Sequence, residues 1–456
     1  MKEVSSSDID FEIISNNKTS FKGLTISFSV WNINLSTINT GIVFKNCKFI
    51  GDTLVFSGNN LYNINIFFEN CDLKKVYLYI NDSKIQTLKI FNSSIGNLEI
   101  NKTSFYKIII QNNISFDHLS FDSISVKKDF YLYKNKNINK LSVFNISSEK
   151  LVINENYIQD IFFKDINKLS NLFFNKNNIA EKVIFIDNTL NHIDFEKTKF
   201  YSDKGDLRLI GNTFNETVYL SNIQAEKIEL YIRSCSFNKF VRFNNSNFNT
   251  LILSQNNFRD ISSFQDLSCN YLKIETTNFE KIAFFDDINI KYISKCDIKT
   301  IRNIKHQLLR SNNLIDFEKF RSYELNSYKN LLKKKNKKWF NNKDAFILTI
   351  SSFYSDNGLN WLKAVKNTII VALFFYSILF CIHYFQTNYI LLNTENYKIF
   401  FNGFFRFFIL TDFYSPFEIK KIYINTPLEW IIFILGKIFI GIGIYEIIKS
   451  FRKYKK

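Results

Sequence analysis

The stretch that decides the fold is Ile90-Phe-Asn-Ser-Ser-Ile95-Gly-Asn-Leu-Glu-Ile100-Asn-Lys-Thr-Ser-Phe105-Tyr-Lys-Ile-Ile-Ile110, in which a large apolar residue occupies every fifth position. A five-residue step does not suit a helix of about 3.6 residues per turn, because its apolar face would drift around the axis. An apolar-x-apolar triplet also returns at Leu98–Ile100 and Ile108–Ile110, as a short strand does in stacked coils. The stretch therefore predicts a mainly β solenoid whose coil has four short sides and about 20–22 residues.

The same period extends through most of the first 300 residues. Further five-residue runs are Phe68, Leu73 and Leu78; Ile153, Ile158 and Phe163; Leu190, Phe195 and Phe200; Phe243, Phe248, Leu253 and Phe258; and Ile274, Phe279 and Phe284. Occasional six-residue steps interrupt the register, as from Phe214 to Leu220. About 270 residues with this repeat predict roughly 13 coils stacked at about 4.8 Å, and hence a rod of about 60 Å.

A small residue precedes the apolar one by two positions in many repeats, as in Cys47-Lys-Phe49, Cys71-Asp-Leu73, Cys235-Ser-Phe237 and Cys296-Asp-Ile298. In this feature, over roughly residues 20–300, the chain resembles the pentapeptide-repeat family. The resemblance implies a right-handed quadrilateral β-solenoid. Leucine-rich repeats are the structural alternative, but their unit of about 20–29 residues has no five-residue subperiod.

The pattern changes near Ile301, where apolar residues are spaced among many charges in the manner of amphipathic helices. We assign residues 1–20 to an N-terminal cap, 21–300 to the solenoid, 301–362 to a helical stalk and 363–456 to a membrane domain. The stalk carries the basic run Lys333–Lys338. We expect this run to contact anionic lipid headgroups, because apolar segments follow closely in sequence. A solvated helix end is the alternative.

Two apolar segments near the C-terminus are long enough to cross about 30 Å of hydrocarbon as helices. They span about residues 365–386 and 428–448. Between them, the aromatic-rich residues 398–412, which include the cation Arg406, predict an interfacial or re-entrant segment. Two spans around a short apolar segment are also the topology of two-helix ion channels, but this segment lacks the potassium-filter sequence.

The charge distribution points to a membrane surface, within a net charge of +17. Residues 301–366 hold 14 basic and 5 acidic side chains and the last eight residues hold 5 basic ones, whereas residues 1–300 are close to neutral. By the positive-inside rule, we expect a multi-pass protein of the inner (cytoplasmic) membrane with both termini and the solenoid in the cytoplasm. A near-neutral solenoid gives no reason to expect a nucleic-acid partner.

Two short motifs flank the predicted spans. Gly358 and Trp361 form a Gly-x-x-Trp element before the first span, and Phe451-Arg452-Lys453 closes the second. In these motifs the chain resembles bacterial membrane-associated pentapeptide-repeat proteins with two C-terminal transmembrane helices. The resemblance implies no known reaction, so no functional role carries over to any residue.

Lys437 falls near the middle of the second predicted span. A charged side chain at this depth is a candidate functional residue, and snorkelling or pairing with Glu429 or Glu446 is the alternative. Gly436 and Gly443 are seven residues apart and share a helix face, where small residues permit close packing of helices. The candidates for membrane contact or helix packing are Lys437, Gly436, Gly443, Arg406, Trp361, Gly358, Arg452 and Lys453.

The sequence predicts neither catalytic residues nor metal or cofactor ligands. The four histidines, His118, His192, His306 and His383, are scattered, without a nucleophile–base pairing, metal-ligand spacing or phosphate-binding loop. Four of the six cysteines occupy the small repeat position, where we expect them to pack in the interior, with a redox or metal role as the alternative. The chain is therefore predicted not to be an enzyme.

Two functions fit these features. The first is a membrane-anchored interaction scaffold whose cytoplasmic solenoid binds an unknown protein partner, because solenoids present long, regular surfaces. The alternative is an oligomeric channel-like or membrane-perturbing effector in bacterial defence, gated through the solenoid. A pore built from two spans per chain requires several subunits, whereas a scaffold can be monomeric, so formation of a homo-oligomer distinguishes the two.

Overall fold

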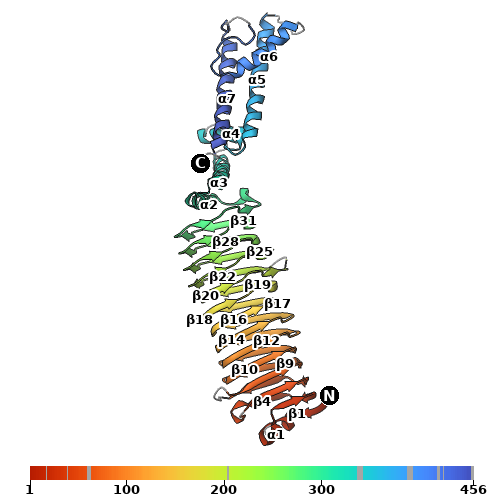
Figure 1. The fold of residues 1–456 in the computed structure, drawn as a ribbon. Coiled ribbons are helices and arrows are strands. Elements are labelled where there is room, and N and C mark those ends of the chain that lie inside the picture. The colour runs from red at the N-terminus through yellow and green to blue at the C-terminus, as the bar shows by residue number, and fades with distance from the viewer. Residues whose placement is uncertain are drawn as a thin grey trace. The chain divides into compact units, whose positions relative to one another are not determined.

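Two compact units, Met1–Asn303 and Ile304–Lys456, make up the computed structural model of the chain. The structure describes residues 1–16, 18–38, 40–58, 63–202, 205–335, 342–387, 394–418, 422–424 and 426–452. The first unit is a mainly β parallel solenoid of about 13 turns, and the second is helical (Figure 1). The mainly β solenoid that the five-residue period predicts is thereby confirmed.

Two parallel ladders of strands form the walls of the solenoid. In the described residues, the seventeen strands of the first sheet are β1 (Lys2–Ser5), β3 (Leu24–Ser27), β4 (Val30–Asn34), β6 (Lys48–Ile50), β7 (Thr53–Ser57), β9 (Asp72–Asn81), β11 (Ser94–Asn101), β13 (Phe116–Asp122), β15 (Ile138–Phe144), β17 (Tyr157–Lys164), β19 (Asn178–Ile186), β21 (Lys199–Phe200), β22 (Asp206–Ile210), β25 (Gln224–Arg233), β28 (Asn247–Ser254), β31 (Ser268–Glu275) and β34 (Asn289–Ile290). Those of the second sheet are β2 (Ser20–Lys22), β5 (Ile42–Lys45), β8 (Asn65–Glu69), β10 (Lys84–Phe91), β12 (Ser104–Gln111), β14 (Ser125–Tyr133), β16 (Ser147–Asn154), β18 (Lys168–Phe173), β20 (Thr189–Asp194), β23 (Thr213–Phe214), β24 (Val218–Tyr219), β26 (Ser236–Phe237), β27 (Val241–Arg242), β29 (Asn257–Phe258), β30 (Ser262–Ser263), β32 (Asn278–Phe279) and β33 (Ala283–Phe284). Single 3₁₀ turns are η1 (Leu35–Thr37) and η2 (Ile293–Lys295).

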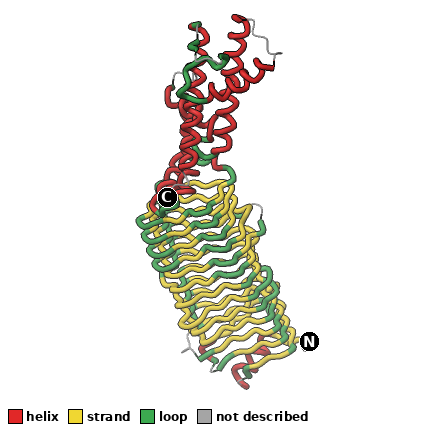
Figure 2. The backbone as a smooth tube through the Cα atoms, turned by 45° about the horizontal axis from the view of Figure 1, so that its top comes forward, coloured by secondary structure: helices red, strands yellow, loops and turns green. Residues whose placement is uncertain are grey.

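The chain passes from one sheet to the other and back within each coil, so a strand pairs in parallel with the strand one coil further on. Ile85 of β10 lies beside Phe105 of β12, and Ile100 of β11 lies beside Phe121 of β13, which are steps of 20 and 21 residues. The apolar residues of the deciding stretch, Ile90, Ile95, Ile100, Phe105 and Ile110, are all fully buried. Figure 2 shows strands and loops alternating along the turns of the solenoid.

Left-handed backbone at the corners of the coil explains why Asn and Asp recur between strands. Residues with φ between +44° and +55° follow one another at intervals of 10 to 12 positions, as at Asn70, Asp82, Asn92, Lys102, Asn112 and Ser123. Most residues are strained at such angles, and Asn and Asp tolerate them best after glycine. The corners therefore favour short polar side chains at a fixed spacing, which keeps the strands between them similar in length.

A ladder of buried asparagine side chains runs through the interior at the small position of the repeat. Asn113, Asn135, Asn156 and Asn177 are at most 1% exposed. Asn135 Oδ1 accepts hydrogen bonds from the backbone N–H and Nδ2 of Asn113 at 3.0 and 2.9 Å, and Asn135 Nδ2 donates to Ile110 O at 3.0 Å. Asn156 accepts from Asn135 in the same manner. A buried polar group without its partner costs about 1–3 kcal/mol, so each of these coils depends on the asparagine of the next.

Phenyl rings stack between coils in the second half of the solenoid, which accounts for part of the 51 phenylalanines. Phe214, Phe237 and Phe258 form a column with centroid separations of 4.9 and 4.6 Å. Phe243 and Phe264 stack at 4.6 Å in a second column. These separations are close to the roughly 4.8 Å between neighbouring strands, so the rings repeat at the spacing of the coils.

Five cysteines are buried, namely Cys47, Cys71, Cys235, Cys269 and Cys296, whereas Cys381 is exposed. Cys235 Sγ donates to Leu209 O at 3.3 Å. Burial raises the pKa of the Cys235 thiol to about 11 and that of Cys269 to about 12. A protonated thiol is a poor nucleophile and metal ligand, so these two side chains fit a packing role.

The helices in the described part of the chain are α1 (Ser6–Asn16), α2 (Ile298–Arg310), α3 (Leu314–Lys335), α4 (Lys343–Ser355), α5 (Trp361–Thr387), α6 (Thr394–Phe408) and α7 (Pro427–Phe451). The predicted spans at 365–386 and 428–448 fall within α5 and α7, and the predicted segment at 398–412 overlaps α6. Within the basic run Lys333–Lys338, Asn336, Lys337 and Lys338 lie outside the described residues.

Helical segments close both ends of the solenoid. At the first end, β1 pairs with β3, α1 follows β1 with Ile13 buried, and Trp31 Nε1 donates to Asp10 Oδ1 at 2.9 Å. At the other end, Thr300 of α2 is fully buried and its Oγ1 accepts a hydrogen bond from Ile274 N at 2.8 Å. An unpaired strand edge is a template for association with other chains, so these segments protect the terminal coils.

The inward direction of β11 is tested by Ile100→Asp, which places a carboxylate in the fully buried interior. We expect a loss of several kcal/mol, because the charge leaves water without gaining a partner. Hydrogen–deuterium exchange of the full chain in detergent should become faster in β9, β11 and β13. Lys84→Asp on β10, where the side chain is exposed, is the control and should change exchange little. Unchanged exchange around β11 in Ile100→Asp would contradict the register.

Candidate functional site

Two helices, α5 and α7, are long and apolar enough to cross a membrane. The candidate spans are Trp361–Phe385 and Pro427–Phe451, each of 25 residues. At about 1.5 Å per residue such a helix is about 37 Å long, which exceeds the roughly 30 Å of hydrocarbon in a bilayer. The described residues thus provide two candidate spans, which is fewer than the multi-pass arrangement expected from the sequence.

Gly436 and Gly443 bring α7 close to its neighbours. A Cβ on Gly443 would lie 2.2 Å from Thr368 Oγ1 of α5, and a Cβ on Gly436 would lie 2.5 Å from Phe407 Cζ of α6. Both distances are too short for non-bonded atoms, so a side chain at either position would have to displace a neighbouring group. Gly441 differs, because a Cβ there would lie 3.9 Å from the nearest atoms, which belong to Leu410.

Lys437 caps the C-terminal end of α6 and is only 6% exposed. Its Nζ donates to the carbonyl oxygens of Ile409 and Arg406, the latter at 3.4 Å. The rings of Phe433 and Phe407 flank the ammonium, with centroids at 4.9 and 5.4 Å. The last carbonyls of a helix lack intrahelical donors and carry partial negative charge, and aromatic faces attract cations. The surroundings of Lys437 therefore compensate its charge.

The two glutamates of α7 have partners other than Lys437. Glu429 Oε1 lies 3.3 Å from His383 Nδ1 of α5. Glu446 accepts a hydrogen bond from the Ser355 hydroxyl of α4. Both carboxylates are about 95% buried. The ion pair between Lys437 and Glu429 or Glu446, which the sequence left open, is therefore not formed in this structure.

Arg406 of α6 holds the segment that follows this helix. Its Nε donates to Asp412 Oδ2 at 3.2 Å, and its Nη1 donates to Glu418 O at 2.8 Å. Lys437 bonds to the start of the same segment through Ile409 O. Two cations from different helices thus fix the path of the chain after α6.

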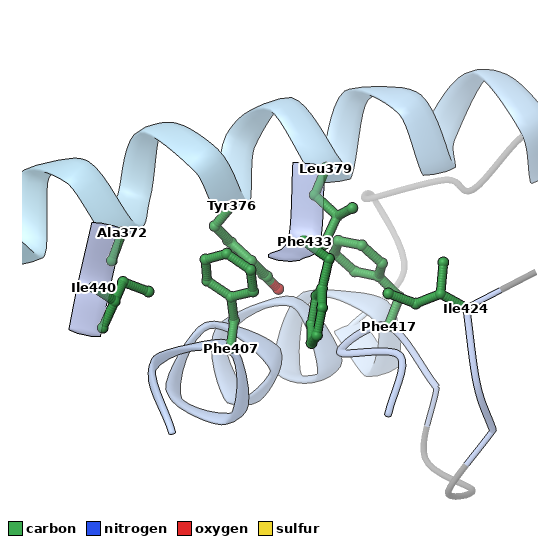
Figure 3. Packing of buried hydrophobic residues seen from close by; sticks show 8 residues of the cluster. All are labelled: Ala372, Tyr376, Leu379, Phe407, Phe417, Ile424, Phe433 and Ile440. Carbon is green, nitrogen blue, oxygen red and sulfur yellow. The ribbon is translucent and has the colours of Figure 1, made fainter. Parts of the chain in front are cut away.

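An apolar cluster joins α5, α6 and α7, as Figure 3 shows. Its buried members are Ala372, Tyr376, Leu379, Phe407, Phe417, Ile424, Phe433 and Ile440. The ring of Tyr376 lies 5.7 Å from that of Phe407 and 5.4 Å from that of Phe417, measured between centroids. The Tyr376 hydroxyl donates to Phe400 O at 2.6 Å. The cluster holds α6 against the pair of apolar helices.

The Gly-x-x-Trp element and the C-terminal end of α7 lie against each other. Trp361 packs on Phe451 with ring centroids 5.2 Å apart. Gly358 has a φ of +94°, and a Cβ there would lie 3.3 Å from Lys449 Cε. The two motifs that carry the family resemblance at this end of the chain therefore meet in one junction, which we call the motif junction.

Charged side chains at the end of α7 connect the motif junction to α4. Lys449 Nζ donates to Ser351 Oγ at 3.0 Å and to Glu446 Oε1 at 3.1 Å. Arg452 is the C-cap residue of α7 and is exposed, whereas Lys453 lies outside the described residues. Lys449 is therefore the basic residue that this end of α7 uses for internal contacts.

On the solenoid, cations and aromatic rings follow one another along the outer face of the second sheet. Lys107, Tyr131, Lys150, Phe173, His192 and Tyr219 make up this aromatic–cation row. Lys150 Nζ lies 6.0 Å from the Tyr131 centroid and 5.3 Å from the Phe173 centroid. The rings of Phe173 and Tyr219 lie 5.5 and 5.6 Å from that of His192. Aromatic side chains are enriched at protein interfaces, so the row is a candidate binding surface.

The sequence reasoning missed this row, although its period was visible. Lys107, Asp129, Lys150, Asn171 and His192 lie side by side in successive coils, at steps of 22, 21, 21 and 21 residues. A search at the length of the coil, instead of at five residues, would have brought these positions together. The asparagine ladder was missed for the same reason.

Comparison of the chain with protein families, curated proteins and solved structures found no match. The fold and the site therefore define the class by themselves. This class is a parallel β-solenoid in one chain with two candidate membrane-spanning helices.

The close approach of α5 and α7 predicts a difference between two glycines of the same helix. Gly443→Ala should destabilise the helical unit by about 1–3 kcal/mol, because the new methyl group overlaps Thr368. Gly441→Ala has room, and should be neutral or stabilising by up to about 1 kcal/mol through helix propensity. Thermal unfolding of the purified full chain in detergent measures both. Equal effects of the two substitutions would contradict the packing.

The cap on α6 predicts that Lys437→Leu acts locally. The change removes a buried ammonium that costs about 2.5–3.5 kcal/mol in mid-membrane, but it also leaves carbonyls unpaired at about 1–3 kcal/mol. We therefore expect little change in the thermal midpoint together with faster amide exchange at residues 409–414. Lys437→Arg, which keeps a donor, should preserve more of the protection. Exchange that stays unchanged in Lys437→Leu would contradict the cap.

Proposed function

We propose that the chain is a membrane-anchored interaction scaffold whose solenoid recruits a protein partner. The observation that supports this most is the presence in one chain of a solenoid of about 13 turns and two helices long and apolar enough to span a bilayer. Stacked coils present a long, regular surface for binding. The aromatic–cation row is the part of that surface we assign to the partner.

The helical unit supports an anchoring role because its ionisable groups have partners inside the unit. Lys437 donates to the carbonyls at the end of α6, and Glu446 accepts from Ser355 and Lys449. Polar groups in hydrocarbon must find partners within the protein. A helix pair with these contacts can remain in a bilayer without a further subunit.

We also propose a relation to bacterial membrane-associated pentapeptide-repeat proteins, on the five-residue period and the motif junction. The chain would reside in the inner membrane, with both termini and the solenoid in the cytoplasm, because basic residues flank the two spans. Its first partner is then the lipid bilayer, with anionic headgroups at Lys333–Lys338. Nucleic acid has no role in this proposal.

The orientation predicts the accessibility of three positions. Single cysteines are placed by Ser7→Cys, Asn402→Cys and Arg452→Cys in a Cys381→Ser background, because Cys381 is exposed in the native chain. A membrane-impermeant maleimide should label only Asn402→Cys in intact cells. Ser7→Cys and Arg452→Cys should react only after permeabilisation. Labelling of Ser7→Cys from outside would reverse the orientation.

The scaffold proposal predicts a partner whose retention depends on the aromatic–cation row. The full chain is purified from detergent beside a Tyr131→Ala, Phe173→Ala double variant, and bound proteins are quantified. We expect the partner to fall by about tenfold or more in the double variant, because aromatic anchors each contribute about 1–2 kcal/mol at interfaces. Tyr157→Ala, exposed on β17 outside the row, is the control. Equal retention by all forms would remove the row from the proposal.

The alternative is an oligomeric channel-like or membrane-perturbing effector in bacterial defence. The helix α6, held between the two candidate spans, is the feature that favours it. Vesicles containing the purified chain separate the two functions. Ion leakage that grows with the formation of homo-oligomers would support the effector, whereas tight vesicles with monomeric protein would support the scaffold.

A further inference from the structure

An apolar groove lies between α4 and α5 in the helical unit. Its volume is about 450 Å³, within the roughly 300–1,000 Å³ of small-molecule sites. Ile350 and Phe353 of α4, Ile370 and Phe374 of α5, and Phe439 of α7 are among its lining residues. The groove therefore suits an apolar ligand.

The α5 wall of the groove lies at the depth of the hydrocarbon if α5 spans a bilayer. Ile370 and Phe374 lie 9 and 13 residues after Trp361, the first residue of the span, or about 13 and 20 Å along the helix. They are 48% and 60% exposed, so the open side of the groove faces away from the helical unit. An occupant at this depth must itself be apolar.

Polar side chains continue the same face of α5 toward its N-terminal end. Lys363, Asn367, Ile370 and Phe374 are spaced at i, i+4, i+7 and i+11, which places them on one side of the helix. Asn367 Nδ2 donates to the carbonyl oxygen of Phe353, which also lines the groove. From Lys363 to Ile370 is about 10 Å, slightly more than the roughly 5–8 Å of one headgroup layer.

Two cations meet at Ser352, the residue before the groove wall. Lys329 Nζ donates to Ser352 Oγ at 2.8 Å, and Lys363 Nζ donates to Ser352 O at 3.3 Å. Lys363 also pairs with Asp356, whereas Lys329 has no ion pair among the described residues. Burial lowers the pKa of Lys329, and the positive charges of Lys333 and Lys363 lower it further. Mutual repulsion of this kind is relieved by an anion.

We propose that the groove binds one acyl chain of an anionic phospholipid, whose phosphate is held by Lys329 and Lys363. The inference rests on the proposed membrane anchoring and adds to it a selected lipid. The positive charges at Ser352 complement the phosphate, and the apolar walls that begin at Phe353 continue along the acyl chain. A zwitterionic lipid could fill the groove equally well, but its net neutral headgroup would gain less from the two lysines.

Native mass spectrometry of the full chain, purified with equal amounts of phosphatidylglycerol and phosphatidylcholine, tests this site. We expect one phosphatidylglycerol to remain on each chain. Ile370→Trp, which fills the groove, should lower its retention by about tenfold, or about 1.4 kcal/mol. Ile369→Trp is the matched control, because this neighbour is 41% exposed but does not line the groove. Equal loss in both variants would overturn the site.

Charge variants test the phosphate contacts. Lys329→Gln and Lys363→Gln should each reduce the preference for phosphatidylglycerol over phosphatidylcholine by about tenfold, whereas Lys366→Gln, an exposed lysine of the same helix, should keep it. An unchanged preference, or a second copy of the chain in place of lipid, would overturn the proposal. Pelleting of the same variants with membranes reports on anchoring separately. A chain that pellets but retains no lipid refutes this inference alone.

Discussion

The register between successive coils is the constraint on which the solenoid depends. Because the strands are parallel and one coil apart, every inward side chain lies beside the equivalent side chain of the next coil. A shift of one residue would turn a strand's interior side chains toward solvent. The asparagine ladder and the phenyl columns add a second requirement, since each member needs the same chemistry about one coil further on. Longer steps, such as the 24 residues from Val183 to Leu207, keep the strand pairing.

A different constraint governs the helical unit, where α5 and α7 carry ionisable groups within mainly apolar helices. Three of these groups, Lys437, Glu446 and Glu429, are buried, and each contacts a segment outside α7. Carbonyls at the end of α6 serve Lys437, while side chains of α4 and α5 serve the two glutamates. Contacts of this kind connect four helices that packing alone would orient less specifically. Gly436 and Gly443 permit these contacts, because they allow α7 to approach its neighbours closely.

The solenoid could be predicted from sequence because its signal is local and repeated many times. Ile90, Ile95, Ile100, Phe105 and Ile110 revealed the inward direction of their coil without any knowledge of its neighbours. The aromatic–cation row could not be found in this way, since its members meet only after the coil length is known. The partner of Lys437 was beyond sequence reasoning for another reason. A backbone carbonyl leaves no trace in residue identity, so the glutamates were the visible choices and neither is the partner. The two spans were readable from length and apolarity alone.

The closed ends of the solenoid have a consequence for how such a chain can change in length. Since β1 and α1 finish one end and α2 finishes the other, the coils between them interact mainly with their direct neighbours. Tandem duplication of about 21 residues in the middle would therefore lengthen the stack by one coil, about 4.8 Å, without altering either terminus. Deletion of one coil would shorten it by the same amount. The number of coils is thus open to change by recombination within the gene, whereas the terminal segments must be retained as they are.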